Sequence, residues 1–354
     1  MMSCFRPESL LSACRSRLLP LVAASLLLGF GSARAAPVDE ERYVSVGDID
    51  EWIEIHGQSD RNPILLWING GPGGSMIPNA FAYQPWENRF TMVMWDQRGE
   101  GKTFEKYGAT LADTMTVERM SQDGIAVAEY LHKRMPKAKI VLLGHSWGTV
   151  LGIHMVRNRP DLFAAYVGTG QVTSLPKQIE ATYPQLLAYA EKMGNADAVQ
   201  ELIKGGVPSS ENPTGYDVTN NWSAAFEPDE LPAMESTRQP PEDRPDYLDA
   251  GEEFSLNTLN DALNRENLPA LGSNFKLPMF FIQGEHDFVT DTSKVREYYN
   301  QITAPVKRLV LLKDHGHLAI MQDRDGFLNT LVTHVLPVIT PAYSGLAAGF
   351  SASN

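Results

Sequence analysis

Cysteine is almost absent from this chain, which has 354 residues and only Cys4 and Cys14, both near the N-terminus. If this N-terminal segment is removed, the remaining chain can form neither a disulfide nor a cysteine-bound metal site. The histidines and acids also lack a ligand spacing such as His-x-x-x-His, which metal-binding helices use. We therefore expect no metal and no other cofactor.

Long apolar runs are equally scarce, and the one that comes nearest to a membrane span lies at residues 18–30. Three arginines precede this run, and Ala-Arg-Ala at 33–35 offers a cleavage site before Ala36. These features predict a signal peptide at residues 1–35 that exports the chain to the periplasm or the exterior. Because the run is short for a membrane span, we expect cleavage and no stable membrane association afterwards. A retained anchor is the alternative.

Basic residues are outnumbered, since the chain has 30 lysines and arginines against 43 acids and a formal net charge of −13. Removal of residues 1–35 takes away four arginines and one glutamate, which changes the net charge to −16. Such a surplus of acids argues against nucleic acid and anionic membranes as partners. It is compatible with a site that attracts a positively charged amine. The sequence gives no indication of an oligomeric state.

What the chain does contain is Gly-His-Ser-Trp-Gly at 144–148, directly after four apolar residues at 140–143. The apolar run predicts a buried parallel strand, and residues 149–158 have the spacing of a helix. A serine between two glycines at a strand-to-helix turn is the nucleophile elbow of α/β-hydrolases, which exposes Oγ of Ser146 above the sheet. In that turn the backbone N–H of Trp147 points to the position where an oxyanion forms.

Two later apolar runs, 279–282 and 308–312, each end in a polar loop that carries acids and histidines. Open α/β sheets place their catalytic groups after the carboxyl ends of the strands. The chain order Ser, Asp, His is the order found in α/β-hydrolases. We predict that Asp287 orients the imidazole of His317, and that His317 takes the serine proton and returns it to the leaving group.

Both assignments have competitors in the same loops. His315 is close to His317, but the triad histidine of α/β-hydrolases usually follows a glycine and precedes a helix, which favours His317. For the acid, Asp291 and Asp314 compete with Asp287. Asp291 is better interpreted as the N-cap of the helix that follows it.

A glycine-rich loop at 69–74 follows another predicted strand, 64–68, and can supply a second N–H for the oxyanion. Glycine lets the backbone approach a substrate closely and adopt a positive φ, and we assign the donor to Gly71. The loop is not a Walker loop, because no Gly-Lys-Ser/Thr follows, and it lacks the spacing of a dinucleotide fingerprint. A plain turn between a strand and a helix is the alternative.

Three motifs together resemble the proline iminopeptidase branch of the α/β-hydrolases. Asn-Gly-Gly-Pro-Gly at 69–73 corresponds to the family's His-Gly-Gly-Pro-Gly, and 144–148 corresponds to its Gly-Gly-Ser-Trp-Gly. Asp-Gln-Arg-Gly-Glu-Gly-Lys-Thr at 96–103 corresponds to Asp-Gln-Arg-Gly-x-Gly-x-Ser, and the resemblance runs from about residue 51 to 337. The departures from the family pattern are Asn69, Thr103 and His145. The glycine loop also resembles those of serine carboxypeptidases and secreted tripeptidyl aminopeptidases.

The strand pattern stops between residues 172 and 274, where helical stretches at 184–193 and 197–204 precede a run rich in proline and acids at 227–249. This segment lies after the sixth core strand, where α/β-hydrolases insert a cap; a disordered insertion is the alternative. We predict an α/β-hydrolase fold, a mostly parallel sheet flanked by helices with a helical cap inserted after the sixth core strand. The expected parts are the core at 36–171 and 275–340, the cap at 172–274 and a C-terminal tail at 341–354.

The resemblance implies a serine hydrolase that forms an acyl-enzyme and releases N-terminal residues from short peptides. In proline iminopeptidases, cap glutamates pair with the free α-amine of the substrate, and the candidates here are Glu227, Glu252 and Glu253. A carboxylesterase or lactonase uses the same machinery on an ester and is the main alternative. A non-catalytic binding protein is disfavoured, because such proteins typically lose a triad residue and this chain keeps all three.

Overall fold

The computed structural model describes residues 35–227 and 245–340. The predicted signal peptide, apart from Ala35, the greater part of the run at 227–249 and the predicted tail at 341–354 lie outside the described residues.

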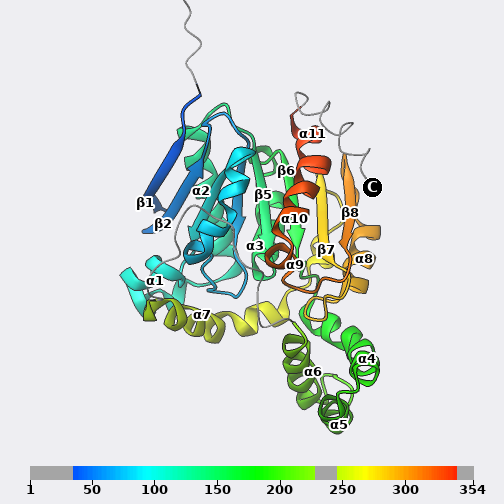
Figure 1. Ribbon diagram of the computed structural model, residues 1–354. Helices are drawn as coiled ribbons and strands as arrows, with labels where there is room; N and C mark the ends of the chain where they lie inside the picture. Colours follow the sequence, from blue (N-terminus) through cyan, green and yellow to red (C-terminus); the bar gives the residue numbers. More distant parts are fainter. Residues whose placement is uncertain (1–34, 228–244, 341–354) are drawn as a thin grey trace, which may run out of the picture. The chain divides into compact units, whose positions relative to one another are not determined.

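One sheet of eight strands organises the described chain, in the order β1-β2-β4-β3-β5-β6-β7-β8 (Figure 1). β1 pairs with β2 and β2 with β4 in antiparallel fashion, while all other neighbours are parallel. The strands are β1 (Val38–Val46), β2 (Ile49–Gly57), β3 (Ile64–Ile68), β4 (Thr91–Asp96), β5 (Ile140–His145), β6 (Ala165–Thr169), β7 (Met279–Gly284) and β8 (Lys307–Leu312). The apolar runs of the sequence therefore become strands within one or two residues of their predicted limits.

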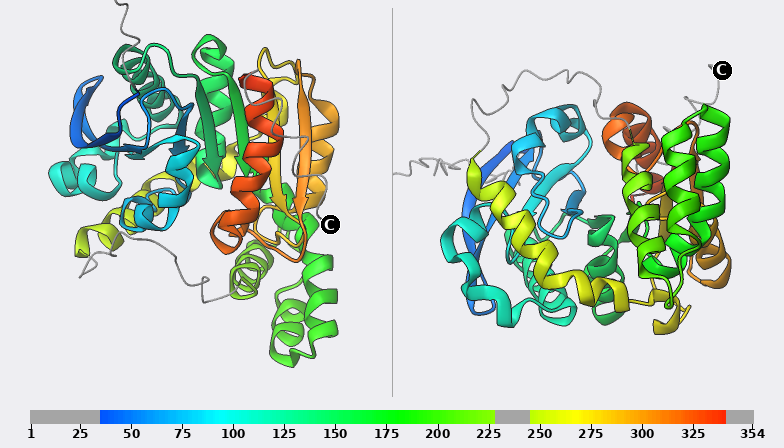
Figure 2. Two further views of the ribbon diagram at one scale, coloured as in Figure 1. Left: turned by 45° about the horizontal axis from the view of Figure 1, so that its top comes forward. Right: turned by 90° about the horizontal axis from the view of Figure 1, so that it is seen from below.

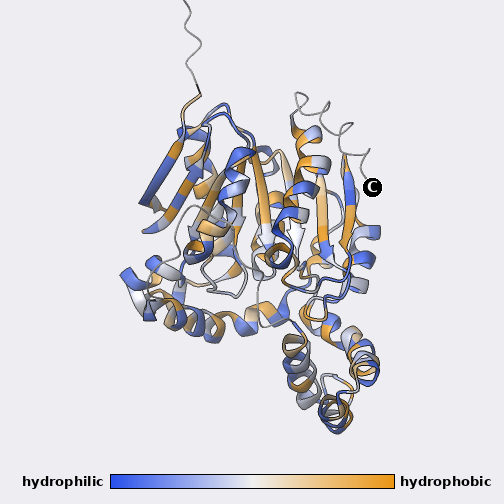
Figure 3. Ribbon diagram, viewed as in Figure 1, coloured by the Kyte–Doolittle hydropathy of each residue, from blue (hydrophilic) through white to orange (hydrophobic). Residues whose placement is uncertain are grey.

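The central strands β3 to β7 are buried along their whole length, as expected for parallel strands covered on both faces. Figure 3 shows the apolar colouring along the middle of the sheet, and Figure 2 shows helices on either side of it. One face packs against α2 and α3 and the other against α10 and the 3₁₀ segment η1 (Ile77–Asn88). The core helices are α1 (Gly101–Tyr107), α2 (Val117–Arg134), α3 (Trp147–Asn158), α8 (Thr292–Gln301), α9 (Ala319–Gln322), α10 (Arg324–Thr330) and α11 (Leu336–Ile339).

The described residues between β6 and β7 form helices and no strand of the sheet, which confirms the predicted helical cap after the sixth strand. The cap helices are α4 (Leu175–Met193), α5 (Ala196–Gly205), α6 (Pro213–Ala225) and α7 (Asp246–Arg265). The first three share a small apolar cluster, and α7 packs against α1 instead (Figure 1). Residues 172–274 as the limits of a separate domain stay a prediction.

The stretch predicted to be helical at 184–193 is helical, and α4, the helix that contains it, begins nine residues earlier at Leu175. Pro184 lies inside the helix, whereas Pro176 occupies the first turn, where a missing N–H removes no intrahelical bond. Other local predictions hold: α8 follows the N-cap Asp291, whose side chain accepts a hydrogen bond from the N–H of Lys294. Within the described residues, no helix has the length and apolar character needed to cross a bilayer.

Candidate active site

The register of the sheet brings the predicted site loops together. Ile68 at the end of β3 is paired with Gly144 in β5, and His145 is paired with Thr169 at the end of β6. Gly284 of β7 is likewise level with Leu312 of β8. The glycine loop, the serine turn and the loops after β6, β7 and β8 therefore leave the sheet at one edge.

Ser146 occupies the turn between β5 and α3 with φ 51° and ψ −120°. A positive φ is strained for a residue with a side chain, and such strain is typical of functional sites. The turn depends on close approach of the backbone, because a Cβ on Gly148 would collide with the carbonyl oxygen of Ile68. The serine side chain is half-buried at the start of α3, in the conformation that the motif predicts.

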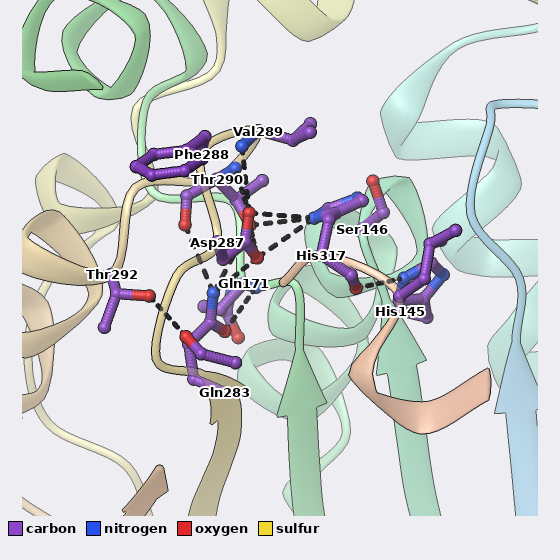
Figure 4. Close-up of polar contacts among 12 residues, drawn as sticks. His145, Ser146, Gln171, Gln283, Asp287, Phe288, Val289, Thr290, Thr292 and His317 are labelled. Carbon is purple, nitrogen blue, oxygen red and sulfur yellow. Dashed lines mark hydrogen bonds and ion pairs between the residues drawn. The ribbon is translucent and has the colours of Figure 1, made fainter. Parts of the chain in front are cut away.

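Asp287 and His317 meet in the loops after β7 and β8. Nδ1 of His317 lies 3.0 Å from Oδ2 and 3.2 Å from Oδ1 of Asp287, and both side chains are buried. In Figure 4 the ring of His317 lies between Asp287 and Ser146. Backbone contacts also place His317 near the serine turn. The N–H of Ser146 donates to the carbonyl of Thr169 at 3.0 Å, and a Cβ on the next residue, Gly170, would lie 2.7 Å from Cε1 of His317.

The competing residues are engaged elsewhere. The ring of His315 contacts a backbone carbonyl of its own loop at 2.6 Å. Asp291 caps α8, and Asp314 is exposed to solvent. Among the candidates named from the sequence, the structure therefore pairs His317 with Asp287.

The carboxylate of Asp287 is held in one orientation by donors that the sequence reasoning did not single out. Oδ1 accepts the N–H groups of Val289 at 3.0 Å and Thr290 at 2.7 Å. Oδ2 accepts Nε2 of Gln283 and Oγ1 of Thr290, each at 2.7 Å (Figure 4). Two signals could have indicated these residues: an Asp in a loop commonly accepts the backbone N–H groups of the residues that follow it, and Gln283 is a polar residue in an otherwise apolar strand.

The pKa values of the two buried histidines of the site are shifted in opposite directions. Burial alone would lower the pKa of His317, but the charge and hydrogen bond of Asp287, helped by the charge of Glu227, raise it above the usual value of a histidine. Burial lowers the pKa of His145 to about 3, so this ring is neutral at ordinary pH. Its Nε2 lies 3.2 Å from the carbonyl oxygen of His317, which assigns the proton of His145 to Nε2.

The glycine loop borders Ser146 and His145. A Cβ on Gly70 would lie 3.2 Å from Cβ of Ser146 and 2.9 Å from Nδ1 of His145. The next residue, Gly71, has φ 113°, which only glycine adopts readily. Trp147 is the first residue of α3, where a backbone N–H has no acceptor within the helix. Trp147 thus follows the serine directly in the chain, and Gly71 follows the glycine that borders it; their role as oxyanion donors stays a prediction.

The motif at 96–103 is hydrogen-bonded to both the serine turn and the glycine loop. Oε1 of Gln97 accepts the indole N–H of Trp147 at 3.3 Å, which ties the loop after β4 to the serine turn. Glu100 is fully buried, its pKa is raised well above the usual value by burial, and it accepts Nδ2 of Asn69 at 2.6 Å. Asn69, which departs from the family pattern, thus has a hydrogen-bond partner in the motif at 96–103.

The three cap acids named from the sequence lie in different surroundings. Oε1 of Glu227 accepts the backbone N–H of His317 at 2.7 Å. Glu252 lies against the glycine loop, with its Cα 2.9 Å and its Oε1 3.7 Å from the positions that Cβ atoms on Gly73 and Gly74 would occupy. Glu253, the next residue of α7, is exposed. The structure thus brings Glu252 and Glu227 to the site loops and leaves Glu253 in solvent.

Two groups of potential metal ligands occur in the described part of the chain, and neither includes a residue of the candidate triad. Glu285, His286 and Asp314 are exposed near the ends of β7 and β8, and Glu41, Glu54 and His56 lie on the hairpin of β1 and β2. Exposed acidic groups such as those of the first set are common in proteins without a metal, and in the second set Glu54 and His56 are buried. The expectation of a metal-free reaction stays a prediction.

Comparison with known proteins agrees with the fold. Residues 63–323 match the family model of the alpha/beta hydrolase fold. The chain is 30% identical over 307 residues to the probable aminopeptidase YbaC of Bacillus subtilis, covering 82% of this chain and 94% of that protein. It is 22% identical to a proline iminopeptidase of Saccharolobus solfataricus, over 82% and 91% of the two chains. A crystal structure of proline iminopeptidase from Mycobacterium smegmatis aligns with a TM-score of 0.59 and 16% identity over 86% of this chain and 100% of that one. The chain therefore belongs to the α/β-hydrolase fold family, and it is a hydrolase that resembles the proline iminopeptidases.

Proposed function

We propose that this protein is a serine hydrolase that uses Ser146, His317 and Asp287, and that it removes N-terminal residues from short peptides. The observation that carries the proposal is the 3.0 Å contact between Nδ1 of His317 and Oδ2 of Asp287. It leaves Nε2 of the imidazole as the nitrogen that can face a serine hydroxyl. The strained backbone of Ser146 and the aminopeptidase names of the relatives support the same function.

In the proposed reaction, Oγ of Ser146 attacks the carbonyl carbon of the scissile bond while its proton moves to Nε2 of His317. The N–H groups of Gly71 and Trp147 donate to the oxyanion. The imidazolium then gives its proton to the leaving amine, and the C–N bond breaks to leave an acyl-enzyme. Water, deprotonated by His317, attacks the ester and releases the acid and the free serine.

Selection of a peptide with a free amine is the finer part of the proposal. Glu252 is half-buried beside the glycine loop, where a carboxylate can pair with an ammonium group next to the scissile carbonyl. The acid-rich chain attracts such a cation over a longer range. Relatives named as aminopeptidase or proline iminopeptidase support this choice over an esterase.

The test compares two matched chromogenic substrates, a prolyl amide with a free amine and a short-chain acyl ester. We expect turnover of the amide, loss of that turnover on N-acetylation, and loss of all turnover in Ser146→Ala. Turnover of the ester alone would keep the triad and indicate a carboxylesterase. Failure on both substrates, together with failure of a fluorophosphonate to label Ser146, would contradict a serine hydrolase and favour a binding protein.

We also propose that the protein acts after export and cleavage before Ala36. The described chain is anchored from this residue onward, because Ala36 donates to Oδ1 of Asp60 at 3.2 Å and accepts the N–H of Asp60 at 2.8 Å. The intact mass of protein recovered from the producing cell tests this proposal. An intact mass that corresponds to a chain starting at residue 1 would contradict it.

A further inference from the structure

The carboxylate of Glu227 is built into the loop that carries His317. Glu227 follows α6 of the cap, and its Oε1 accepts the N–H of His317 at 2.7 Å. Its Oε2 accepts the N–H of Leu318 at 3.4 Å and Nε2 of Gln322 at 3.3 Å. All three donors come from the stretch after β8, two from the loop and Gln322 from the end of α9, so a single cap side chain bonds to three residues of one core segment.

The loop is shaped to receive this carboxylate. A Cβ on Gly316 would collide with the carboxylate of Glu227, so glycine at this position lets the acid reach the backbone. Burial raises the pKa of Glu227, and the N–H of His317 partly offsets this rise. An ionised carboxylate with backbone donors makes stronger hydrogen bonds than a neutral group would.

His317 is consequently held from three directions. Asp287 holds the ring at Nδ1, and His145 of the core donates to the carbonyl oxygen of His317 at 3.2 Å. Glu227 accepts the N–H of the same residue and is the anchor that comes from the cap. Two anchors belong to the sheet and its loops, Asp287 after β7 and His145 at the end of β5, whereas the third is present only when the end of α6 is docked against the segment after β8.

We propose that Glu227 is a positioning residue through which the cap fixes the imidazole of His317 for proton transfer, rather than a ligand for the substrate amine. This inference rests on the proposed function. Because the carboxylate is already engaged by backbone donors, binding an ammonium group would require it to release His317. Glu252 has no such bond to the histidine loop among the contacts of the described residues.

The test uses Glu227→Gln in the full chain, with Glu227→Ala as the larger perturbation. Both oxygens of the Glu227 carboxylate accept N–H groups. In the glutamine variant the amide NH₂ group therefore replaces one acceptor and faces another donor. We expect kcat to fall about tenfold in Glu227→Gln and about hundredfold in Glu227→Ala, by misplacement of the base. The loss should be equal on the free-amine amide and the uncharged ester, with KM little changed. Glu191→Gln, which removes an exposed charge from α4, is the matched control and should behave as the wild type.

Acid titration separates positioning from a general loss of stability. The charged and titratable groups that face His317 are Asp287 from the loop after β7, His145 from β5 and Glu227 from the cap. His145 is neutral, and the negative charge of Glu227 helps to raise the pKa of His317. Removing that charge should therefore move the acid limb of the rate profile, and the titration of His317 followed by NMR, to lower pH.

Three results would overturn the inference. One is a rise in KM confined to the free-amine substrate, which would make Glu227 the amine ligand. Another is an unchanged kcat, and the third is an unchanged titration of His317 in a variant that keeps its thermal unfolding temperature. Because NMR titration needs no turnover, it tests the contact between Glu227 and His317 even if the wild type hydrolyses neither substrate. That inactivity would count against the proposed function alone.

Discussion

The two sides of the site are built very differently. On the sheet side, the candidate triad comes from loops at the ends of buried strands, and Asp287 and His317 are 2% and 8% exposed. On the cap side, helices α4 to α6 share an apolar cluster whose four fully buried residues come from α4 and α5, and Met193, Ile203 and Val207 nearby are more than 60% exposed. A large dry core fixes side chains in place, whereas a small one permits local movement.

The cap nevertheless contacts the core at the loops that carry the site. Ser255 of α7 donates to the carbonyl of Gly99 at 2.8 Å, next to the glycine loop. Oγ1 of Thr182 in α4 donates to the carbonyl of Phe288 at 3.0 Å, one residue after Asp287. We therefore infer that the sheet side holds the reacting groups rigidly, whereas the cap side positions the loops around them and contacts the substrate. Variants on the two sides should differ in kind as well as in size.

The largest effect should come from the sheet side, in Asp287→Asn. An amide cannot both accept the backbone donors of its loop and hold His317 in the required tautomer, so we expect kcat to fall about 10⁴-fold on either substrate. The new NH₂ group also faces Gln283 or Thr290, which should lower the free energy of unfolding by about 1–3 kcal/mol. Ser146→Ala is the control, since it should match the loss of activity without that loss of stability. A decline of less than tenfold would mean that Asp287 is not the orienting acid.

A second effect belongs to the wild type and concerns pH. His317 acts as a base only when neutral, and its pKa is raised above the usual histidine value near 6.5. We therefore expect kcat/KM to fall as the pH is lowered through a midpoint above 6.5, and to fall about tenfold per pH unit below it. His145 should not contribute, because its pKa of about 3 lies far below this range. A midpoint below pH 6 would contradict the assigned environment of His317.

A third effect tests how tightly the glycine loop fits the serine. Gly70→Ala places a methyl group 3.2 Å from Cβ of Ser146 and 2.9 Å from Nδ1 of His145, so the loop or the serine must shift. We expect kcat to decrease about tenfold to hundredfold, because small displacements of reacting groups are costly. Gly74→Ala in the same loop meets its nearest neighbour at 3.4 Å and should lose less. Equal losses in both variants would point to a general disturbance of the loop.

The sheet side of the site could be predicted from the sequence more fully than the cap side. The strands of the sheet are apolar runs, and the nucleophile turn is a local motif, so residues such as Ser146 can be found without knowing any long-range contact. The prediction that His317 and Asp287 pair used the rule that parallel strands end at one edge, together with the chain order Ser, Asp, His of α/β-hydrolases. Hydrogen bonds that cross large sequence distances could not be predicted, and Glu227 lies 90 residues from His317.

The cap was harder because its helices lack comparable motifs. The sequence predicts a helical stretch at 184–193, but α4 begins earlier, at Leu175, and continues through Pro184. The three acids Glu227, Glu252 and Glu253 looked alike in the sequence. Only their positions relative to the loops after β3 and β8 separate a bound carboxylate, a half-buried one and an exposed one.

The smallest effect should come from the cap side, in Glu252→Gln. If Glu252 pairs with the substrate amine, the variant should raise KM for the free-amine amide about tenfold, the loss of one partly exposed ion pair. The acyl ester has no ammonium group, so its kcat and KM should stay unchanged, and it serves as the internal control. This pattern is the opposite of that expected for Glu227→Gln, where kcat changes on both substrates. An equal change on amide and ester would place Glu252 with the positioning residues, and the division between a rigid sheet side and a substrate-selecting cap would fail at that position.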